Sequence, residues 1–287
     1  MKKRQVVFAD LHTHSTASDG ILTPTQIIEK AEQLGLSALA LTDHDTLRGI
    51  KEAQSASTGR DIQLIAGTEL SCGRPGSERS VHVLGLFVSP EKNKLSELLD
   101  VQRDLRYKRG FKILNLLREQ GFNMDKLEEE FKNKPDKVIG RPDFAHYLQD
   151  NGYISSFDDA FKKYLGCGCP AYVQKDYIDF DVAIDAIHEA GGLAIIAHPG
   201  LIPVWEPIWE DIKDLPWDGI EVFYIEHSNS QIKKFFDLAN EHHLIATGGS
   251  DFHGDYGKHR DRLGRGGLSE EQFDEFINFA KARGIKI

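Results

Sequence analysis

The stretch QVVFADLHTHSTASDG (residues 5–20) decides the fold class, because a short apolar run ends directly in a group of polar side chains. Residues 5–11 are apolar and of strand length, and His12, His14 and Asp19 follow them. Similar apolar runs recur at 36–43, 62–70, 81–88, 192–200, 219–226 and 243–253. Helical periods separate most of these runs, so the sequence predicts an α/β fold of seven strands.

The direction of one strand follows from the length of its connection. Residues 71–80 alone join the third run to the fourth, whereas a parallel crossover needs about a dozen residues or more. The strand at 81–88 should therefore run antiparallel to 62–70. Seven strands with intervening helices favour a distorted (β/α) TIM-like barrel, although periodicity alone does not exclude a doubly wound open sheet.

A helical block interrupts this alternation. Apolar residues at helical spacing predict a long helix over 95–119, followed by helices at 124–132, 142–150 and 156–165. We therefore expect a barrel made of residues 1–93 and 173–287, with a helical insertion domain at 94–172. Outside the insertion, the expected helices lie at 24–34, 47–57, 181–191, 229–241 and 270–283.

The composition excludes several classes of protein. The 287 residues carry a formal net charge of −10, so a surface for long duplex nucleic acid is not expected. No apolar run reaches the ~18 residues of a membrane span, and the basic start lacks the apolar stretch of a signal peptide. Three cysteines give no disulfide framework. We expect a cytoplasmic protein, and its oligomeric state is not readable.

Polar side chains lie at the strand ends that should meet at one mouth of the barrel. The antiparallel strand brings His82 to the same face at its amino end. One such histidine alone is more often a hydrogen-bonded loop residue than a ligand, but a cluster this dense needs a cation to balance its buried charge. The nine candidate metal ligands are His12, His14, Asp19, His44, Glu69, His82, His198, Asp251 and His253.

The chemistry of these donors indicates the kind of metal. Imidazole and carboxylate donors without a thiolate favour Mn²⁺, with Fe²⁺ or Zn²⁺ as alternatives, over copper or an iron–sulfur cluster. Nine donors exceed the need of one ion, so we expect two to three divalent metal ions. Glu69 follows a central strand and is the candidate bridging ligand.

Six motifs, taken together and in order, resemble the PHP (polymerase and histidinol phosphatase) family. They are DLHTHSTASDG (10–20), LTDHD (41–45), GTEL (67–70), VHVLG (81–85), AHPG (197–200) and GSDFHG (249–254). The resemblance is greatest to small stand-alone bacterial phosphoesterases that act on nucleotides or short oligonucleotides, including 3′,5′-bisphosphonucleosides. It implies a seven-stranded distorted barrel with a helical insertion, and a small phosphorylated substrate.

The resemblance also implies how the ligands divide among three metals. The first would be held by His12, His14, Glu69 and Asp251, the second by Glu69, His82 and His198, and the third by Asp19, His44 and His253. The implied reaction is attack of a metal-activated hydroxide on phosphorus.

Four further residues are candidates for contact with the substrate. The segment VIGRPDFAHYL (138–148) resembles the family's phosphate-contact segment, and its Arg141 precedes Pro142 at a predicted helix start, where anions are attracted. Arg141 is thus both a catalytic and a substrate-binding candidate. His227 follows a strand and could contact the substrate or donate a proton. Arg109 and Lys175 are further binding candidates, although Arg109 could instead extend along the barrel surface.

Three alternatives remain at this point. An amidohydrolase also begins with His-x-His after its first strand, but it normally has a bridging lysine where this chain has Glu69. A non-catalytic, metal-stabilised PHP module would bind metal without turnover. Within the enzymes, a histidinol-phosphatase-like phosphomonoesterase is the alternative substrate class.

Overall fold

The computed structural model describes residues 7–74, 80–134, 137–254 and 261–287. The chain divides into two compact units, one made of Met1–Leu98 with Tyr177–Ile287 and the other of Leu99–Asp176. Among the described residues, no helix combines the length and the apolar character that crossing a bilayer requires.

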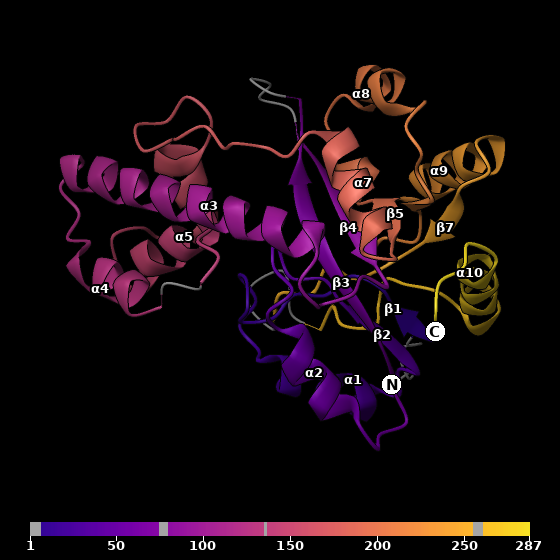
Figure 1. Ribbon diagram of the computed structural model, residues 1–287. Coiled ribbons are helices and arrows are strands. Elements are labelled where there is room, and N and C mark those ends of the chain that lie inside the picture. The colour runs from indigo at the N-terminus through magenta and orange to yellow at the C-terminus, as the bar shows by residue number, and fades with distance from the viewer. Residues whose placement is uncertain (1–6, 75–79, 135–136, 255–260) are drawn as a thin grey trace. The chain divides into compact units, whose positions relative to one another are not determined.

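The first unit is built on a seven-stranded mixed sheet whose strands follow one another in chain order (Figure 1). The strands are β1 (Ala9–Asp10), β2 (Ala38–Leu41), β3 (Gln63–Cys72), β4 (Val81–Leu86), β5 (Leu193–Ile196), β6 (Gly219–Glu221) and β7 (Ile245–Thr247). β4 runs antiparallel to both neighbours, which confirms the direction inferred from its short connection, and every other pair is parallel.

The two edges of this sheet meet, so the sheet closes into a distorted barrel. The Leu11 amide donates to the Gly248 carbonyl at 3.1 Å, and the His14 amide donates to the Phe252 carbonyl at 2.9 Å. A parallel bridge joins Thr13 to Phe252. The fold class predicted from the sequence is therefore confirmed, and the residues that follow β1 and β7 lie side by side.

Side chains alternate along the strands between two buried layers, as the pleat requires. On β2, Ala38 and Ala40 belong to a cluster with Leu84 and Ile195 of other strands. Leu39 and Leu41 belong to a second cluster that includes residues of α1 and α2. Because both faces of the sheet are covered, the strands read as nearly continuous apolar runs.

The helices of the first unit follow local signals in the sequence. α1 begins after Thr23, which forms a capping box with Gln26, and ends at Gly35 with a φ of 83°. α10 begins with the same kind of box between Ser269 and Gln272. The bounds are α1 (Pro24–Leu34), α2 (Ile50–Ser57), α7 (Phe180–Glu189), α8 (Trp205–Ile212), α9 (Asn229–Glu241) and α10 (Glu270–Ala282).

The helical unit has a core of its own. α3 (Lys94–Glu119) leaves the first unit, and α4 (Asp125–Asn133), α5 (Arg141–Asp150), α6 (Phe157–Ala160) and a π-helical turn (Phe161–Leu165) follow. Phe131 of α4 and Phe144 of α5 are fully buried, with ring centroids 5.6 Å apart in an edge-to-face arrangement. Leu114 and Leu117 of α3 join the same cluster.

Candidate metal centre

The nine side chains proposed as metal ligands are gathered at the mouth of the barrel. Most lie just beyond the carboxyl ends of parallel strands. His82 is brought there because it pairs with Ser71 at the end of β3 in the antiparallel register. Three overlapping groups have donor atoms that all lie within 4.8 Å of one another: His12, His14, Glu69 and Asp251; His14, Asp19, His44 and His253; and His44, Glu69 and His82.

Glu69 lies at the centre of this arrangement and is fully buried. Its Oε2 atom is 3.2 Å from His12 Nε2, 3.1 Å from His14 Nε2 and 3.0 Å from His44 Nδ1. Asp251 completes this side, because its Oδ1 atom is 3.4 Å from His12 Nε2 and 3.1 Å from His14 Nε2. One carboxylate oxygen thus faces three imidazoles from two segments of the chain, the one that carries His12 and His14 and the one that carries His44.

The other oxygen of Glu69 faces a different pair of imidazoles. Its Oε1 atom is 2.7 Å from His82 Nδ1 and 3.0 Å from His198 Nε2. Because the two oxygens of one carboxylate address separate groups of nitrogens, Glu69 has the geometry of a bridging ligand between two cation positions.

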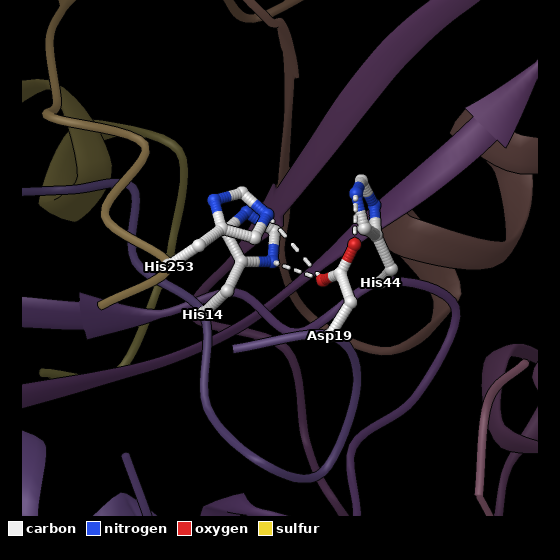
Figure 2. A group of neighbouring side chains, drawn as sticks. All are labelled: His14, Asp19, His44 and His253. Atoms are coloured by element: carbon white, nitrogen blue, oxygen red, sulfur yellow. Dashed lines mark ion pairs between the residues drawn. The ribbon is translucent and has the colours of Figure 1, made fainter. Parts of the chain in front are cut away.

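Asp19 lies at the centre of the group that it forms with His14, His44 and His253. Its carboxylate lies between His44 on one side and His14 and His253 on the other, as Figure 2 shows. Asp19 Oδ1 is 3.3 Å from His253 Nε2 and 4.0 Å from His14 Nδ1, and Asp19 Oδ2 is 3.8 Å from His44 Nε2. The rings of His14 and His253 are stacked with centroids 4.1 Å apart. His14 therefore belongs both to the group around Asp19 and to the group that contains His12, Glu69 and Asp251.

The residues present fit divalent cations. Within the described part of the chain, His12 Nε2, His14 Nε2, His44 Nδ1 and Glu69 Oε2 are all buried without a hydrogen-bond partner. They lie at hydrogen-bonding distance from one another, yet their directions do not form hydrogen bonds. Leaving several buried polar atoms unsatisfied is costly, and divalent cations placed between them would engage these atoms.

The carboxylates of the cluster are held in their charged form. Burial acts to raise the pKa of Glu69, but His44, His82 and His12 around it hold that pKa well below its usual value. Burial likewise acts to raise the pKa of Asp251, and His12 and His253 hold it well below the usual value. The ionised carboxylates therefore depend on the imidazoles around them for compensating positive charge.

The backbone is strained where the last ligands enter the site. His198 and Asp251 have left-handed backbones, with φ of 28° and 50°. Such conformations are costly for residues other than glycine and concentrate at functional sites. Gly249 permits a close approach, because a Cβ atom at this position would lie 2.3 Å from the Cβ of His12. The small residue Gly249 and the strained turn at Asp251 both lie where the chain after the last strand meets the chain after the first.

Glu221, at the end of β6, supports the cluster from outside and was not anticipated from the sequence. It is fully buried, its Oε1 atom is 3.2 Å from His12 Nδ1, and its Oε2 atom accepts the His198 amide at 2.7 Å. A carboxylate on the far nitrogen of a ligating histidine fixes its tautomer and orientation. The charged residue inside the apolar run GIEVF was the signal that could have revealed it.

Other polar side chains fix the loops that carry the ligands. Asp43 accepts three hydrogen bonds of 2.7 Å, from the Ser15 amide, the Ser15 hydroxyl and the Ser18 hydroxyl. Asp10 accepts the amide of Ser250 at 2.9 Å, among other amides. The Tyr224 hydroxyl donates to Asp251 Oδ2 at 3.1 Å. The second oxygen of Asp251 is thereby held away from the imidazoles, leaving Oδ1 to face them.

His227 does not have the free nitrogen that its expected catalytic and substrate-binding role requires. It is buried, its Nδ1 atom lies 2.9 Å from the Val222 carbonyl, and its Nε2 atom accepts the Gly200 amide at 3.1 Å. Burial also lowers the pKa of His227, which favours the neutral ring. Both nitrogens are thus engaged by the backbone, and the ring contacts the segment after His198.

The basic candidates belong to the helical unit. Arg109 on α3 is buried and donates from Nε to the Val173 carbonyl at 2.8 Å. Arg141 begins α5, lies over the ring of Phe161 with 5.5 Å between the guanidinium carbon and the ring centroid, and donates to the Leu165 carbonyl at 3.4 Å. Lys175 is half-buried near the end of this unit.

The sequence is similar to a known protein family and to characterised bacterial proteins. The sequence profile of the PHP domain matches residues 10–166. A 5′-3′ exoribonuclease of Haemophilus influenzae is 38% identical over 248 residues, which cover 85% of this chain and 89% of that protein. A 3′,5′-nucleoside bisphosphate phosphatase of Chromobacterium violaceum is 36% identical over 250 residues, which cover 85% of this chain and 86% of that protein.

Two solved structures share the fold over nearly their whole length. One, from Chromobacterium violaceum, is described as an amidohydrolase with bound sulfate and no metal; it has a TM-score of 0.83 at 33% identity and covers 96% of this chain and 97% of its own. The other, from Bifidobacterium adolescentis, is described as a metal-dependent phosphoesterase; it has a TM-score of 0.84 at 28% identity and covers 99% of both chains.

Proposed function

The chain belongs to the PHP domain family and is a metal-dependent phosphoester hydrolase, and from this premise we propose that its substrates are 5′-phosphorylated nucleotides esterified at the 3′-oxygen. Of the two relatives described above, one is named a 3′,5′-nucleoside bisphosphate phosphatase and the other a 5′-3′ exoribonuclease. One reaction covers both classes: hydrolysis between phosphorus and the 3′-oxygen releases inorganic phosphate from a bisphosphonucleoside, or a 5′-mononucleotide from a short RNA.

The observation that carries this proposal is the convergence of the nine side chains at the mouth of the barrel, where five imidazoles face Glu69. We assign His12, His14, Glu69 and Asp251 to a first cation, Glu69 with His82 and His198 to a second, and Asp19, His44 and His253 to a third. The separate directions of the two Glu69 oxygens support the bridging role. Nitrogen and oxygen donors without a thiolate support Mn²⁺ as the metal.

The side chains around the cations have distinct tasks in the reaction. Divalent ions bound there supply positive charge for the phosphoryl oxygens and lower the pKa of water. Glu221 orients His12, and Tyr224 fixes which oxygen of Asp251 faces the cluster. In the helical unit, Arg109 and Arg141 have guanidinium groups already fixed by backbone carbonyls. Within the helical unit, we propose these two arginines and Lys175 as phosphate-binding side chains.

A hydrolysis screen of the Mn²⁺-loaded protein tests the proposal. Adenosine 3′,5′-bisphosphate should give AMP and phosphate, and a 5′-phosphorylated dinucleotide should give mononucleotides. Histidinol phosphate and an N-acyl amino acid should be poor substrates. The Asp251→Asn variant should lose at least about a hundredfold in kcat/KM, because one charged ligand of the first cation is removed. Asp237→Asn, at an exposed carboxylate of α9, is the matched control.

Two outcomes would reject this function. Preferential turnover of histidinol phosphate would reassign the substrate class. Bound metal without turnover of any phosphoester would support a structural module instead of an enzyme.

A further inference from the structure

A cavity of about 480 Å³ opens beside the candidate metal centre within the barrel unit. Small-molecule sites have volumes of roughly 300–1,000 Å³, so this cavity is large enough for part of a substrate. His82 and His198 form one side, and Ser80 adds a hydroxyl. The other described lining residues are aliphatic: Leu201, Ile202, Pro203, Val204 and Ile208.

The aliphatic side of the cavity is uncovered at its rim. Leu201 is 46% exposed and Val204 is 50% exposed. Single exposed apolar residues are ordinary on protein surfaces, but these two border a cavity that also contains two candidate metal ligands. Their position indicates that an apolar part of the substrate covers them while its ester reaches the metals.

Hydrogen bonds of the neighbouring Gly200 hold the aliphatic side of the cavity in place. The Gly200 amide donates to His227 Nε2, and the Gly200 carbonyl accepts from Gln231 Nε2, both at 3.1 Å. A Cβ atom at Gly200 would lie 2.5 Å from the His227 ring, so the backbone is packed directly against that ring. The segment that leads into Leu201 is therefore fixed before a ligand arrives, which lowers the ordering cost of binding.

We propose that this cavity binds the base of the nucleotide, and the inference rests on the proposed function of the metal centre. The described residues that line the cavity include no lysine or arginine, so it suits an uncharged group better than a phosphate. Aliphatic side chains pack on the flat face of any base. Among the described lining residues, Ser80 is the one side chain besides the imidazoles that can hydrogen-bond to a base edge. The cavity therefore requires a base but discriminates little among bases.

A substrate panel with and without a base tests this inference. We expect kcat/KM for adenosine and cytidine 3′,5′-bisphosphates to agree within about fivefold, because strong discrimination needs a site built to hydrogen-bond one partner. The abasic analogue 1-deoxyribose 3,5-bisphosphate should be at least about tenfold poorer, mainly through KM, since the apolar contacts are lost. Equal turnover of the abasic analogue would overturn the inference and leave the proposed function intact.

Surface variants of the rim provide the matched comparison. Leu201→Ser and Val204→Ser should each raise KM for the bisphosphonucleosides several-fold, and they should leave the abasic analogue unaffected. Because both side chains are about half exposed, neither change should unfold the protein. Val182→Ser, at a 44% exposed valine of α7 that does not line the cavity, is the control. Rim variants that behave like this control would overturn the inference.

A binding measurement separates the cavity from catalysis. Titration calorimetry of the Mn²⁺-loaded protein should show AMP binding at least about tenfold more tightly than ribose 5-phosphate. In the Val204→Ser variant, the affinities for AMP and for ribose 5-phosphate should differ by less. If no phosphoester is hydrolysed, the proposed function fails, and this titration still decides whether the cavity binds a base. Equal affinities for AMP and ribose 5-phosphate would overturn the inference.

Discussion

Replacing Glu221 by glutamine should weaken metal binding although Glu221 is not among the proposed ligands. In the structure one carboxylate oxygen faces His12 Nδ1 at 3.2 Å and the other accepts the His198 amide at 2.7 Å. His12 Nδ1 therefore carries the proton, and its Nε2 atom is left to face Glu69 and Asp251. A glutamine has one acceptor oxygen and can serve only one of the two donors.

The size of the effect follows from the two ways in which the amide can lie. If its oxygen faces His198, its NH₂ group faces His12 Nδ1 and drives the proton to Nε2, the atom that should hold the metal. If its oxygen faces His12, the buried backbone amide of His198 faces the NH₂ group of the glutamine and loses its acceptor, at a cost of about 1–3 kcal/mol. Loss of such outer hydrogen bonds typically costs about 10–100-fold in metal affinity or activity.

The assay is a titration of metal-free protein with Mn²⁺, followed by kcat/KM at limiting and saturating metal. We expect the dissociation constant for Mn²⁺ in Glu221→Gln to rise about 10–100-fold, with activity partly restored by excess Mn²⁺. Glu241→Gln, at an exposed position at the end of α9, should behave like the unaltered protein. An unchanged Mn²⁺ affinity in Glu221→Gln would refute the role assigned to this carboxylate.

Three further changes test neighbouring parts of the site. Removing metal with a chelator should lower the melting temperature, because ligand at a hundred times its Kd stabilises the folded state by about 2.7 kcal/mol; an unchanged calorimetric melting curve would contradict this. Gly249→Ala should destabilise the protein by about 1–3 kcal/mol in urea titrations, because the added methyl meets His12; unaltered stability would show that the loop yields freely. Tyr224→Phe should weaken Mn²⁺ binding by up to about tenfold, because Asp251 loses its orienting hydrogen bond; no change in the titration would assign Tyr224 to packing alone.

Most of the fold could be predicted because its signals are local. The capping boxes at Thr23 and Ser269 fixed where helices begin, and the short connection at 71–80 fixed the direction of β4. The prediction missed α8, although Trp205, Ile208, Trp209 and Ile212 are at helical spacing and all four are buried. Pro207 in the same segment obscured that period, since proline usually breaks helices outside their first turn.

Most of the predicted strands were longer than the observed ones, and for two of them the reason lies in the site. Strand 192–200 was expected to continue past Ile196, but the positive φ of His198 turns the chain out of the sheet. Strand 243–253 ends at Thr247, and Asp251 adopts a similar left-handed backbone. An apolar run in the sequence does not show where the chain must bend so that a metal-binding side chain can reach the site.

The nine ligand candidates could be found from the sequence because histidines and carboxylates at strand ends converge by topology. Their supporting residues could not, because a hydrogen bond such as that between Glu221 and His12 joins segments 209 residues apart. The backbone partners of His227 could not be predicted for the same reason. Its position after a strand suggested the site, and only the structure places Gly200 and Val222 on its two nitrogens.

The most direct test of the polynuclear centre is an anomalous difference map from crystals of the protein soaked in Mn²⁺. The account predicts two or three peaks, each within coordination distance of the nitrogen and oxygen atoms assigned to it, with one peak on each side of the Glu69 carboxylate. A map with no peak within coordination distance of Glu69 would contradict the account.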